Sequence, residues 1–155
     1  MEAIWASVVA VGGTLLGAVI THLFQLFTSR RSEQFARSEA LRQERIATFS
    51  AFATAVEDYR RGQADRWFRK QRDPEGESFI EARDEAHRLR TAARQVLYRV
   101  KLLTDDSEVI RAAERAYDCT RDLSTARDKA ERDVFDTQSK QAIEAFVDQA
   151  SPLVR

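Results

Sequence analysis

Residues 4–27 of this 155-residue chain read IWASVVAVGGTLLGAVITHLFQLF. The stretch contains no Lys, Arg, Asp or Glu. As an α-helix, its 24 residues extend about 36 Å at about 1.5 Å per residue. The hydrocarbon core of a bilayer is about 30 Å thick, so a helix of this length crosses it. We therefore expect residues 1–28 to form a transmembrane anchor ahead of a polar domain at residues 29–155.

A cleaved signal peptide and a buried core helix are the alternatives to a retained anchor. A signal peptide needs a cationic start, an apolar run of about 7–15 residues and a cleavage site with small residues. Here the only charged side chain before the run is Glu2, and the run ends in large residues at Phe27. The pattern therefore favours a retained anchor.

The charges that flank residues 4–27 predict the orientation of the anchor. Arg30 and Arg31 follow the stretch directly, and no basic residue precedes it. Basic residues beside a span are retained on the cytoplasmic side of the membrane. We therefore predict a single-pass protein of the cell membrane, with its N-terminus outside and its C-terminal domain in the cytoplasm.

One face of the predicted span carries small residues at intervals of three or four. This stripe consists of Ala10, Gly13, Gly17 and Thr21. Small residues at this spacing let two helix backbones approach closely, which is the physical basis of GxxxG dimers. Because Gly is common in membrane helices in any case, the motif alone has low specificity. We expect the protein to be a homo-oligomer that self-associates through this face.

The charges of the chain balance overall but not along its length. The sequence has 25 basic and 25 acidic side chains. Residues 28–72 carry 11 basic and 6 acidic side chains, whereas residues 105–148 carry 7 and 12. The overall balance gives no sign of a uniformly basic, nucleic-acid-binding chain, and the opposite signs of these two segments favour their pairing.

The polar domain has helical periodicity throughout. Its apolar residues recur at intervals of three to five, and no stretch alternates with a period of two. Turn signals occur at residues 73–76, which read Asp-Pro-Glu-Gly, and near residue 105, where Asp105 and Glu108 have the spacing of a capping box. We predict an all-α fold, in which the membrane helix continues into an antiparallel, coiled-coil-like bundle of three long helices at residues 3–72, 77–103 and 105–150.

Two details of this bundle depend on local sequence. The middle of the third helix is charged and poor in large apolar residues, so it is a solvated protruding helix, a hinge near Ser124 and Thr125, or an oligomer contact. We favour a continuous helix. Opposite charges four residues apart predict ion pairs on the exposed faces. The predicted pairs are Glu33–Arg37, Glu57–Arg61, Asp65–Arg69, Asp84–Arg88, Asp128–Arg132 and Asp136–Lys140.

The sharpest local feature of the domain is residues 59–72, YRRGQADRWFRKQR. Basic groups neutralise phosphates and aromatic rings stack on bases, so this segment is a candidate surface for nucleic acid, or for an acidic protein or lipid. Packing against the acidic third helix explains the same composition without a ligand, and we favour that explanation. The candidate residues for an anionic partner are Arg60, Arg61, Arg66, Trp67, Arg69, Lys70 and Arg72.

The sequence contains no catalytic constellation. It lacks a Gly-rich phosphate loop, a GxSxG motif and an HExxH motif. Its single cysteine, Cys119, has no histidine nearby and forms no internal disulfide, which agrees with a reducing cytoplasm. We therefore expect no enzyme activity, no catalytic residue, no cofactor, no metal and no small-molecule substrate.

Several segments, taken in order, resemble a family of small actinobacterial proteins. The apolar stretch VVAVGGTLLGAVITHLF at 8–24 is followed by SEALRQER at 38–45 and by YRR at 59–61. The segment VKLL at 100–103 and a closing SPLVR at 151–155 complete the pattern. In these features the chain is similar to the KilB-type proteins of Streptomyces, which are associated with plasmid spread after conjugation. The resemblance carries over no functional residue.

Together these observations predict a non-enzymatic membrane protein with a cytoplasmic helical scaffold, which the resemblance associates with plasmid spread and conjugal transfer. Two alternatives stay open. One is a membrane tether that binds nucleic acid through residues 59–72, and the other is a small membrane effector whose anchor is its active part.

Overall fold

The computed structural model describes residues 33–155 in full and, for residues 2–32, the helical backbone alone. Among these residues it contains no strand. Its helices are α1 (Glu2–Arg72), α2 (Glu77–Leu103), α3 (Ser107–Asp122) and α4 (Lys129–Ala150), with 3₁₀ turns η1 (Leu123–Thr125) and η2 (Ser151–Val154). The all-α prediction is confirmed, whereas the prediction of three long helices is wrong, because there are four.

The chain divides into two units, Met1–Leu41 and Arg42–Arg155. In the described part of the first unit, the hydroxyl of Ser38 donates to the carbonyl of Phe35 at 2.8 Å. No helix within the fully described residues is long and apolar enough to cross a bilayer. The predicted span at residues 4–27, with its stripe of small residues, lies outside the residues whose side chains are described.

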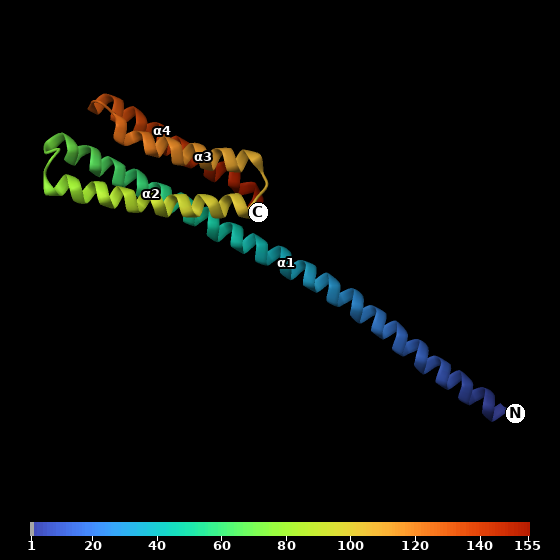
Figure 1. Cartoon of the computed structure of the whole chain (residues 1–155). Helices are drawn as coiled ribbons and strands as arrows, with labels where there is room; N and C mark the ends of the chain where they lie inside the picture. Colours follow the sequence, from blue (N-terminus) through green and yellow to red (C-terminus); the bar gives the residue numbers. More distant parts are fainter. Residues whose placement is uncertain (1) are drawn as a thin grey trace. The chain divides into compact units, whose positions relative to one another are not determined.

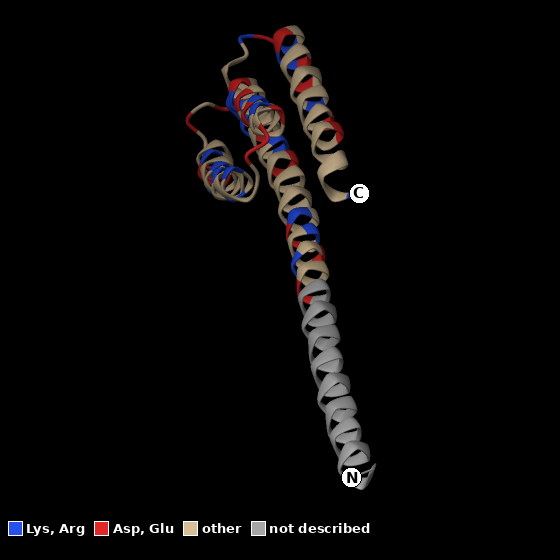
Figure 2. Ribbon diagram, turned by 90° about the vertical axis from the view of Figure 1, so that its right-hand side faces the viewer, with Lys and Arg blue, Asp and Glu red and all other residues tan. Residues whose placement is uncertain are grey.

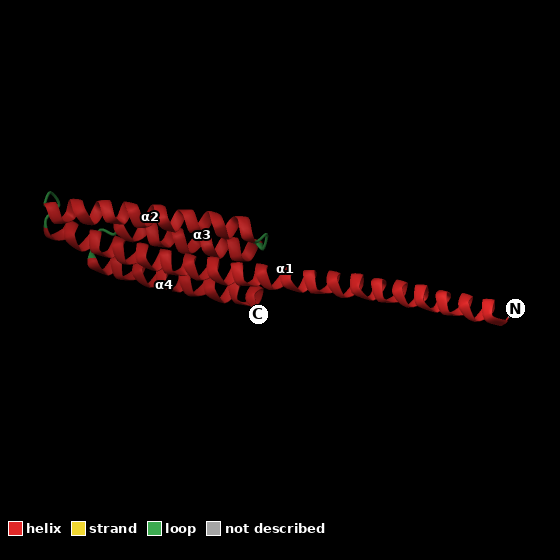
Figure 3. Ribbon diagram, turned by 90° about the horizontal axis from the view of Figure 1, so that it is seen from below, coloured by secondary structure: helices red, strands yellow, loops and turns green. Residues whose placement is uncertain are grey.

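The second unit is a four-helix bundle formed by the C-terminal part of α1 with α2, α3 and α4 (Figure 1). A view from below shows these four helices side by side, with short loops at both ends of the bundle (Figure 3). Short loops place successive helices in antiparallel pairs. The antiparallel packing that the turn signals predict is therefore present, with one more helix than expected.

The core of the bundle combines aromatic side chains from α1, α3 and α4 with aliphatic side chains from all four helices. The rings of Phe52 and Phe146 meet edge to face, with centroids 4.7 Å apart. Burial of each such side chain stabilises the fold by about 1.5–3 kcal/mol. The buried cluster includes Phe49, Phe52, Val56, Tyr59, Ala93, Leu97, Val100, Val109, Ala113, Ala116, Tyr117, Ala142, Phe146 and Ala150.

Glycine allows a close approach between α1 and α2. A Cβ atom at Gly62 would lie 2.6 Å from Cδ1 of Leu89, a distance that requires the leucine to move. The absence of a side chain at this position therefore lets the two helices pack closely.

The N-terminus of α3 is capped by Asp106. Its carboxylate accepts hydrogen bonds from the backbone N–H groups of Glu108, at 2.9 Å, and Val109, at 3.2 Å. Such a cap satisfies donors that have no partner within the helix. The capping box predicted for Asp105 and Glu108 is therefore wrong: the N-cap is Asp106, and the residue three positions after it is Val109.

The helix predicted at residues 105–150 is interrupted, so the prediction of a continuous third helix is wrong. The hydroxyl of Thr125 donates to the carbonyl of Asp122 at 2.6 Å, where α3 ends. The carboxylate of Asp128 accepts from the N–H of Glu131 at 2.8 Å, where α4 begins. These short polar side chains offer the backbone partners that compete with a continuing helix. The break lies at the alternative hinge, and it allows α4 to pack back on α3.

Candidate functional site

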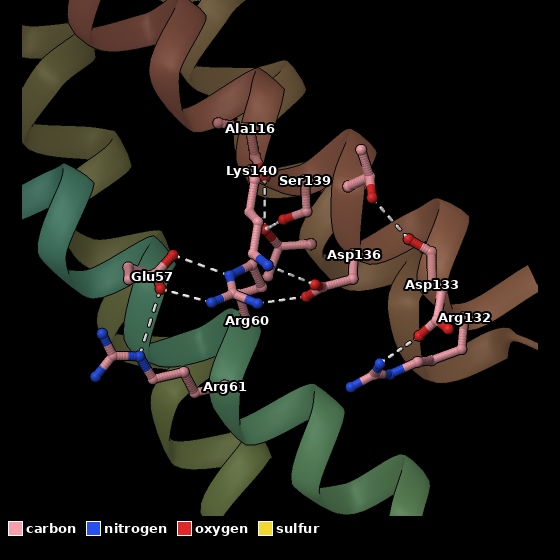
Figure 4. A network of polar contacts seen from close by, with 11 residues as sticks. Glu57, Arg60, Arg61, Ala116, Arg132, Asp133, Asp136, Ser139 and Lys140 are labelled. Carbon is pink, nitrogen blue, oxygen red and sulfur yellow. Dashed lines mark hydrogen bonds and ion pairs between the residues drawn. The ribbon is translucent and has the colours of Figure 1, made fainter. Parts of the chain in front are cut away.

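The candidate segment at residues 59–72 contains an arginine that joins two helices of the bundle. Arg60 of α1 donates two hydrogen bonds to the carboxylate of Glu57, at 2.9 and 2.6 Å, and it also forms an ion pair with Asp136 of α4. Lys140 lies 2.9 Å from the second oxygen of Asp136. In Figure 4 the guanidinium group of Arg60 lies between the two carboxylates. Arg60 is therefore occupied by contacts within the protein.

This network favours the charged forms of its members. The hydrogen bonds from Arg60 hold the pKa of Glu57 below its ordinary value, although burial acts in the opposite direction. Burial also acts to raise the pKa of Asp136, but its bonds with Lys140 and Arg60 outweigh this effect and lower it. The hydrogen bonds that Arg60 donates to Glu57 and to Asp136 raise the pKa of Arg60 above its ordinary value. The network is thus ionised at neutral pH and serves helix pairing.

Trp67 lies in the bundle rather than on its surface. Its side chain is 5% exposed, and its indole Nε1–H donates to the carbonyl of Ala126 at 2.8 Å. Gln63, one turn earlier on α1, donates through Nε2 to the carbonyl of Arg121 and to the hydroxyl of Ser124, both at 3.1 Å. These two side chains of α1 fix the segment between α3 and α4, so the ring of Trp67 is not available for base stacking.

The neighbouring ring, Phe68, is 46% exposed. The guanidinium carbon of Arg132 lies 4.4 Å from its ring centroid, which is the geometry of a cation–π contact. Trp67 and Phe68 also meet edge to face, with centroids 5.2 Å apart. Phe68 therefore contacts α4 through Arg132, whereas Trp67 contacts the segment between α3 and α4.

The remaining basic residues of the segment are more exposed. Arg61 forms a 3.4 Å ion pair with Glu57, and Arg69 forms a 2.9 Å ion pair with Asp65. Arg66 is half-buried, and Lys70 and Arg72 are exposed at the end of α1. Basic and acidic positions alternate along the bundle helices (Figure 2). The structure therefore does not bring the seven predicted residues together into one continuous basic surface.

A comparison with protein families adds to this geometry. Residues 46–154 match the model of the KilB plasmid transfer protein. The chain belongs to the KilB family. This match, which covers well over half of the chain, confirms the resemblance inferred from the sequence motifs. Comparisons with curated proteins and with solved structures found no match.

In this KilB-family chain the matched residues coincide with the bundle. The closing SPLV segment forms η2 and is held against α1, because Nε of Arg42 donates to the carbonyl of Val154 at 2.8 Å. Arg45 reaches the carbonyl of Leu153 at 3.5 Å. These contacts give a structural role to the C-terminal motif on which the sequence resemblance partly rests.

The bundle has an apolar groove beside η2. It has a volume of about 380 Å³, and its lining includes Ile46, Phe49 and Val147. The polar side chains of this lining are Ser50 and Ser151, and it contains no ionisable side chain. In the fully described part of the chain, no group of His, Cys, Asp and Glu residues is arranged to hold a metal ion. The groove therefore lacks the acids and bases that most enzyme mechanisms use.

The sequence patterns did not identify one further cluster, formed by Arg90 and Arg94 of α2 around the hydroxyl of Tyr117 on α3. Nε of Arg90 lies 3.3 Å from this oxygen and Nε of Arg94 lies 3.2 Å from it. Arg90 and Arg94 are four residues apart on one helix face, which is the signal that sequence analysis could have used.

Proposed function

We propose that this KilB-family chain is a non-enzymatic scaffold of plasmid transfer, anchored in the cell membrane by residues 4–27 and self-associating through that helix. The observation that carries the proposal is the family match over residues 46–154, which supports a role related to plasmid transfer. The uncharged stretch at residues 4–27 precedes the matched part and supports the anchor.

The polar contacts and the groove of the bundle agree with the role of a scaffold. The ion pair of Arg60 with Asp136 joins α1 to α4, and the hydrogen bond from Trp67 to Ala126 joins α1 to the segment between α3 and α4. The apolar groove offers two hydroxyls and no ionisable group. A rigid bundle on a membrane anchor can present a fixed surface to other components of a transfer apparatus without chemistry of its own.

The proposal also assigns an orientation. Arg30 and Arg31 follow the uncharged stretch directly and favour a cytoplasmic bundle. In intact cells, protease added from outside should leave the bundle uncut, and removal of residues 1–28 should release the protein from the membrane fraction. A bundle that is cleaved in intact cells, or a truncated protein that stays in the membrane fraction, contradicts this part of the proposal.

The experiment that tests self-association is the mass of the full-length protein in detergent or lipid nanodiscs. We expect a defined oligomer, and we expect the double variant Gly13→Leu, Gly17→Leu to reduce it to a monomer, because leucine prevents close approach of the two backbones. Gly12→Leu is the matched control, since residue 12 lies off the stripe, and it should keep the oligomer.

A monomeric wild-type protein would contradict the scaffold that self-associates. An oligomer that persists in the double variant would place the contact outside the stripe. Loss of the oligomer in Gly12→Leu as well would indicate a general disturbance of the span rather than a specific helix–helix contact.

A further inference from the structure

Two arginines of α2 converge on one phenol oxygen of α3. Nε of Arg90 and Nε of Arg94 donate to the hydroxyl oxygen of Tyr117 at 3.3 and 3.2 Å. The guanidinium carbon of Arg94 also lies 5.8 Å from the ring centroid of Tyr117. The two guanidinium groups therefore lie next to each other on the flank of the bundle, although they carry the same charge.

Most hydrogen-bond donors of this pair are unused. An arginine side chain has five N–H donors, and here each arginine uses Nε on the phenol. Within the described residues, neither Arg90 nor Arg94 has a carboxylate within ion-pair distance, whereas Arg88 on the same helix pairs with Glu85 at 2.5 Å. Two adjacent guanidinium groups without a counter-charge are a favourable place for an oxyanion, which accepts several charge-assisted hydrogen bonds.

More positive charge gathers around the neighbouring tyrosine. The rings of Tyr59 and Tyr117 lie 5.7 Å apart between centroids. Burial and the neighbouring Tyr117 raise the pKa of Tyr59 to about 12, while Arg90, Arg121 and Arg66 act on it in the opposite direction. Arg121 is neutralised by Asp118 at 2.8 Å and by Asp122 at 2.9 Å. Arg66 acts on Tyr59 from the separate segment at residues 59–72.

Helix α2 also carries an exposed aromatic side chain, Tyr98. Tyr98 lies one helical turn after Arg94 and is 55% exposed. An exposed ring one turn from a pair of unneutralised cations is the combination with which proteins hold single strands, because bases stack on the ring while cations bind the phosphates.

We propose that Arg90, Arg94 and the hydroxyl of Tyr117 form a phosphate-binding site for single-stranded nucleic acid, with Tyr98 as the stacking platform. This site is distinct from residues 59–72 and is independent of the oligomeric state of the protein. It adds a ligand to the scaffold function rather than replacing it.

The surroundings favour a nucleic-acid strand over a lipid surface. Acidic groups lie close by on α3, where Glu114 pairs with Lys101 and Asp118 pairs with Arg121. A flat anionic membrane would meet these carboxylates as well as the arginines, whereas a single strand contacts a narrow strip. Because Arg94 is exposed, water competes with a free phosphate ion for its N–H donors. A nucleic-acid strand binds more tightly than a free phosphate ion, because its bases also stack on Tyr98.

The test is fluorescence anisotropy of a labelled oligothymidylate with the full-length protein in neutral detergent, at several salt concentrations. We expect saturable, salt-sensitive binding by the wild-type protein. In Arg90→Gln, Arg94→Gln the slope of log affinity against log salt should fall by about 1.4, the value for two phosphate contacts on a single strand. Tyr98→Ala should weaken binding roughly 5- to 150-fold.

The matched control is Arg88→Gln, Arg99→Gln, which removes the same charge from exposed positions on other faces of α2. It should keep the wild-type slope. Circular dichroism should show that all variants keep their helix content, because glutamine at positions 90 and 94 still offers an amide donor to Tyr117.

Three outcomes would overturn the proposal. The first is no salt-sensitive binding of oligothymidylate by the wild-type protein. The second is an equal loss in the control variant, which would indicate diffuse electrostatics. The third is Arg90- and Arg94-dependent flotation with anionic phosphatidylglycerol vesicles in the absence of oligothymidylate binding, which would assign the site to a lipid headgroup.

Discussion

Arg60 of α1 and Asp136 of α4 form an ion pair whose side chains are only 12% and 14% exposed. The pair joins residues that are 76 positions apart in the chain. It is reinforced on one side by Glu57 and on the other by Lys140, so that cations and carboxylates alternate (Figure 4). The attraction within such a pair is largely offset by the cost of removing both charges from water. Replacing one partner nevertheless lowers the stability of the fold, because the other charge is then buried without compensation.

The first prediction concerns this cost. Arg60→Met keeps an unbranched apolar stem but removes the guanidinium group, which leaves Asp136 in a partly buried place without this partner. Breaking a fully buried pair costs about 3–5 kcal/mol, but Lys140 still compensates Asp136. We therefore expect the free energy of unfolding to fall by about 1–3 kcal/mol, measured by urea denaturation.

Arg61→Met is the control for that measurement, because the side chain of Arg61 is 69% exposed and its ion pair with Glu57 is long, at 3.4 Å. Its effect should stay within about 0.5 kcal/mol. Equal losses of unfolding free energy in the two variants would mean that the partly buried ion pair of Arg60 stabilises the fold no more than the exposed pair of Arg61.

The second prediction is the acid sensitivity of the same network. The pKa values of Glu57 and Asp136 lie below their ordinary values of 4.5 and 3.8. Their contribution to stability is therefore complete above those ordinary values and is lost as the pH falls through the lowered values. Urea denaturation across about pH 5 to pH 2 should show a steeper loss in the wild-type protein than in Arg60→Met. Parallel curves would contradict this assignment.

The third prediction concerns the hydrogen bond by which Trp67 holds the segment between α3 and α4. Trp67→Phe keeps a buried ring but removes the Nε1–H donor, which leaves the carbonyl of Ala126 without this partner. We expect a loss of about 1–3 kcal/mol in unfolding free energy, together with faster amide hydrogen exchange in residues 123–128. The exposed neighbour provides the control, since Phe68→Leu should leave the exchange of this segment unchanged. Unaltered exchange in Trp67→Phe would show that packing alone orders the segment.

Much of the helix layout could be predicted from local sequence signals. The turn at Pro74 and Gly76 separates α1, which ends at Arg72, from α2 at Glu77–Leu103, and both boundaries are where the sequence predicts them. Three of the predicted ion pairs are also present, because residues four apart on a helix meet whatever the tertiary fold. They are Glu57–Arg61, Asp65–Arg69 and Asp136–Lys140.

The partner of each arginine could not be predicted from spacing in the same way. Arg88 pairs with Glu85 rather than with Asp84, and Arg132 pairs with Asp133 while its guanidinium group lies over Phe68. Arg88 chooses between two exposed carboxylates of its own helix, which the spacing alone does not distinguish. The position of Arg132 depends on Phe68, which lies on another helix. For the same reason the composition of residues 59–72 did not reveal that Arg60 and Trp67 point into the bundle.

The last prediction concerns the start of α4, for which the sequence does contain a signal. Asp128 and Glu131 have capping-box spacing, the side chain of Asp128 accepts from the N–H of Glu131 at 2.8 Å, and Oε2 of Glu131 accepts from the N–H of Arg127 at 2.7 Å. Asp128→Ala should cost about 1 kcal/mol in unfolding free energy and speed amide exchange in the first turn of α4. Asp128→Asn keeps an acceptor oxygen and should cost far less. An equal loss in both variants would show that the charge of the carboxylate at the positive end of the helix, rather than its hydrogen bond, sets the beginning of α4. No loss in either would mean that packing of α4 on α3 is sufficient to break the helix at this point.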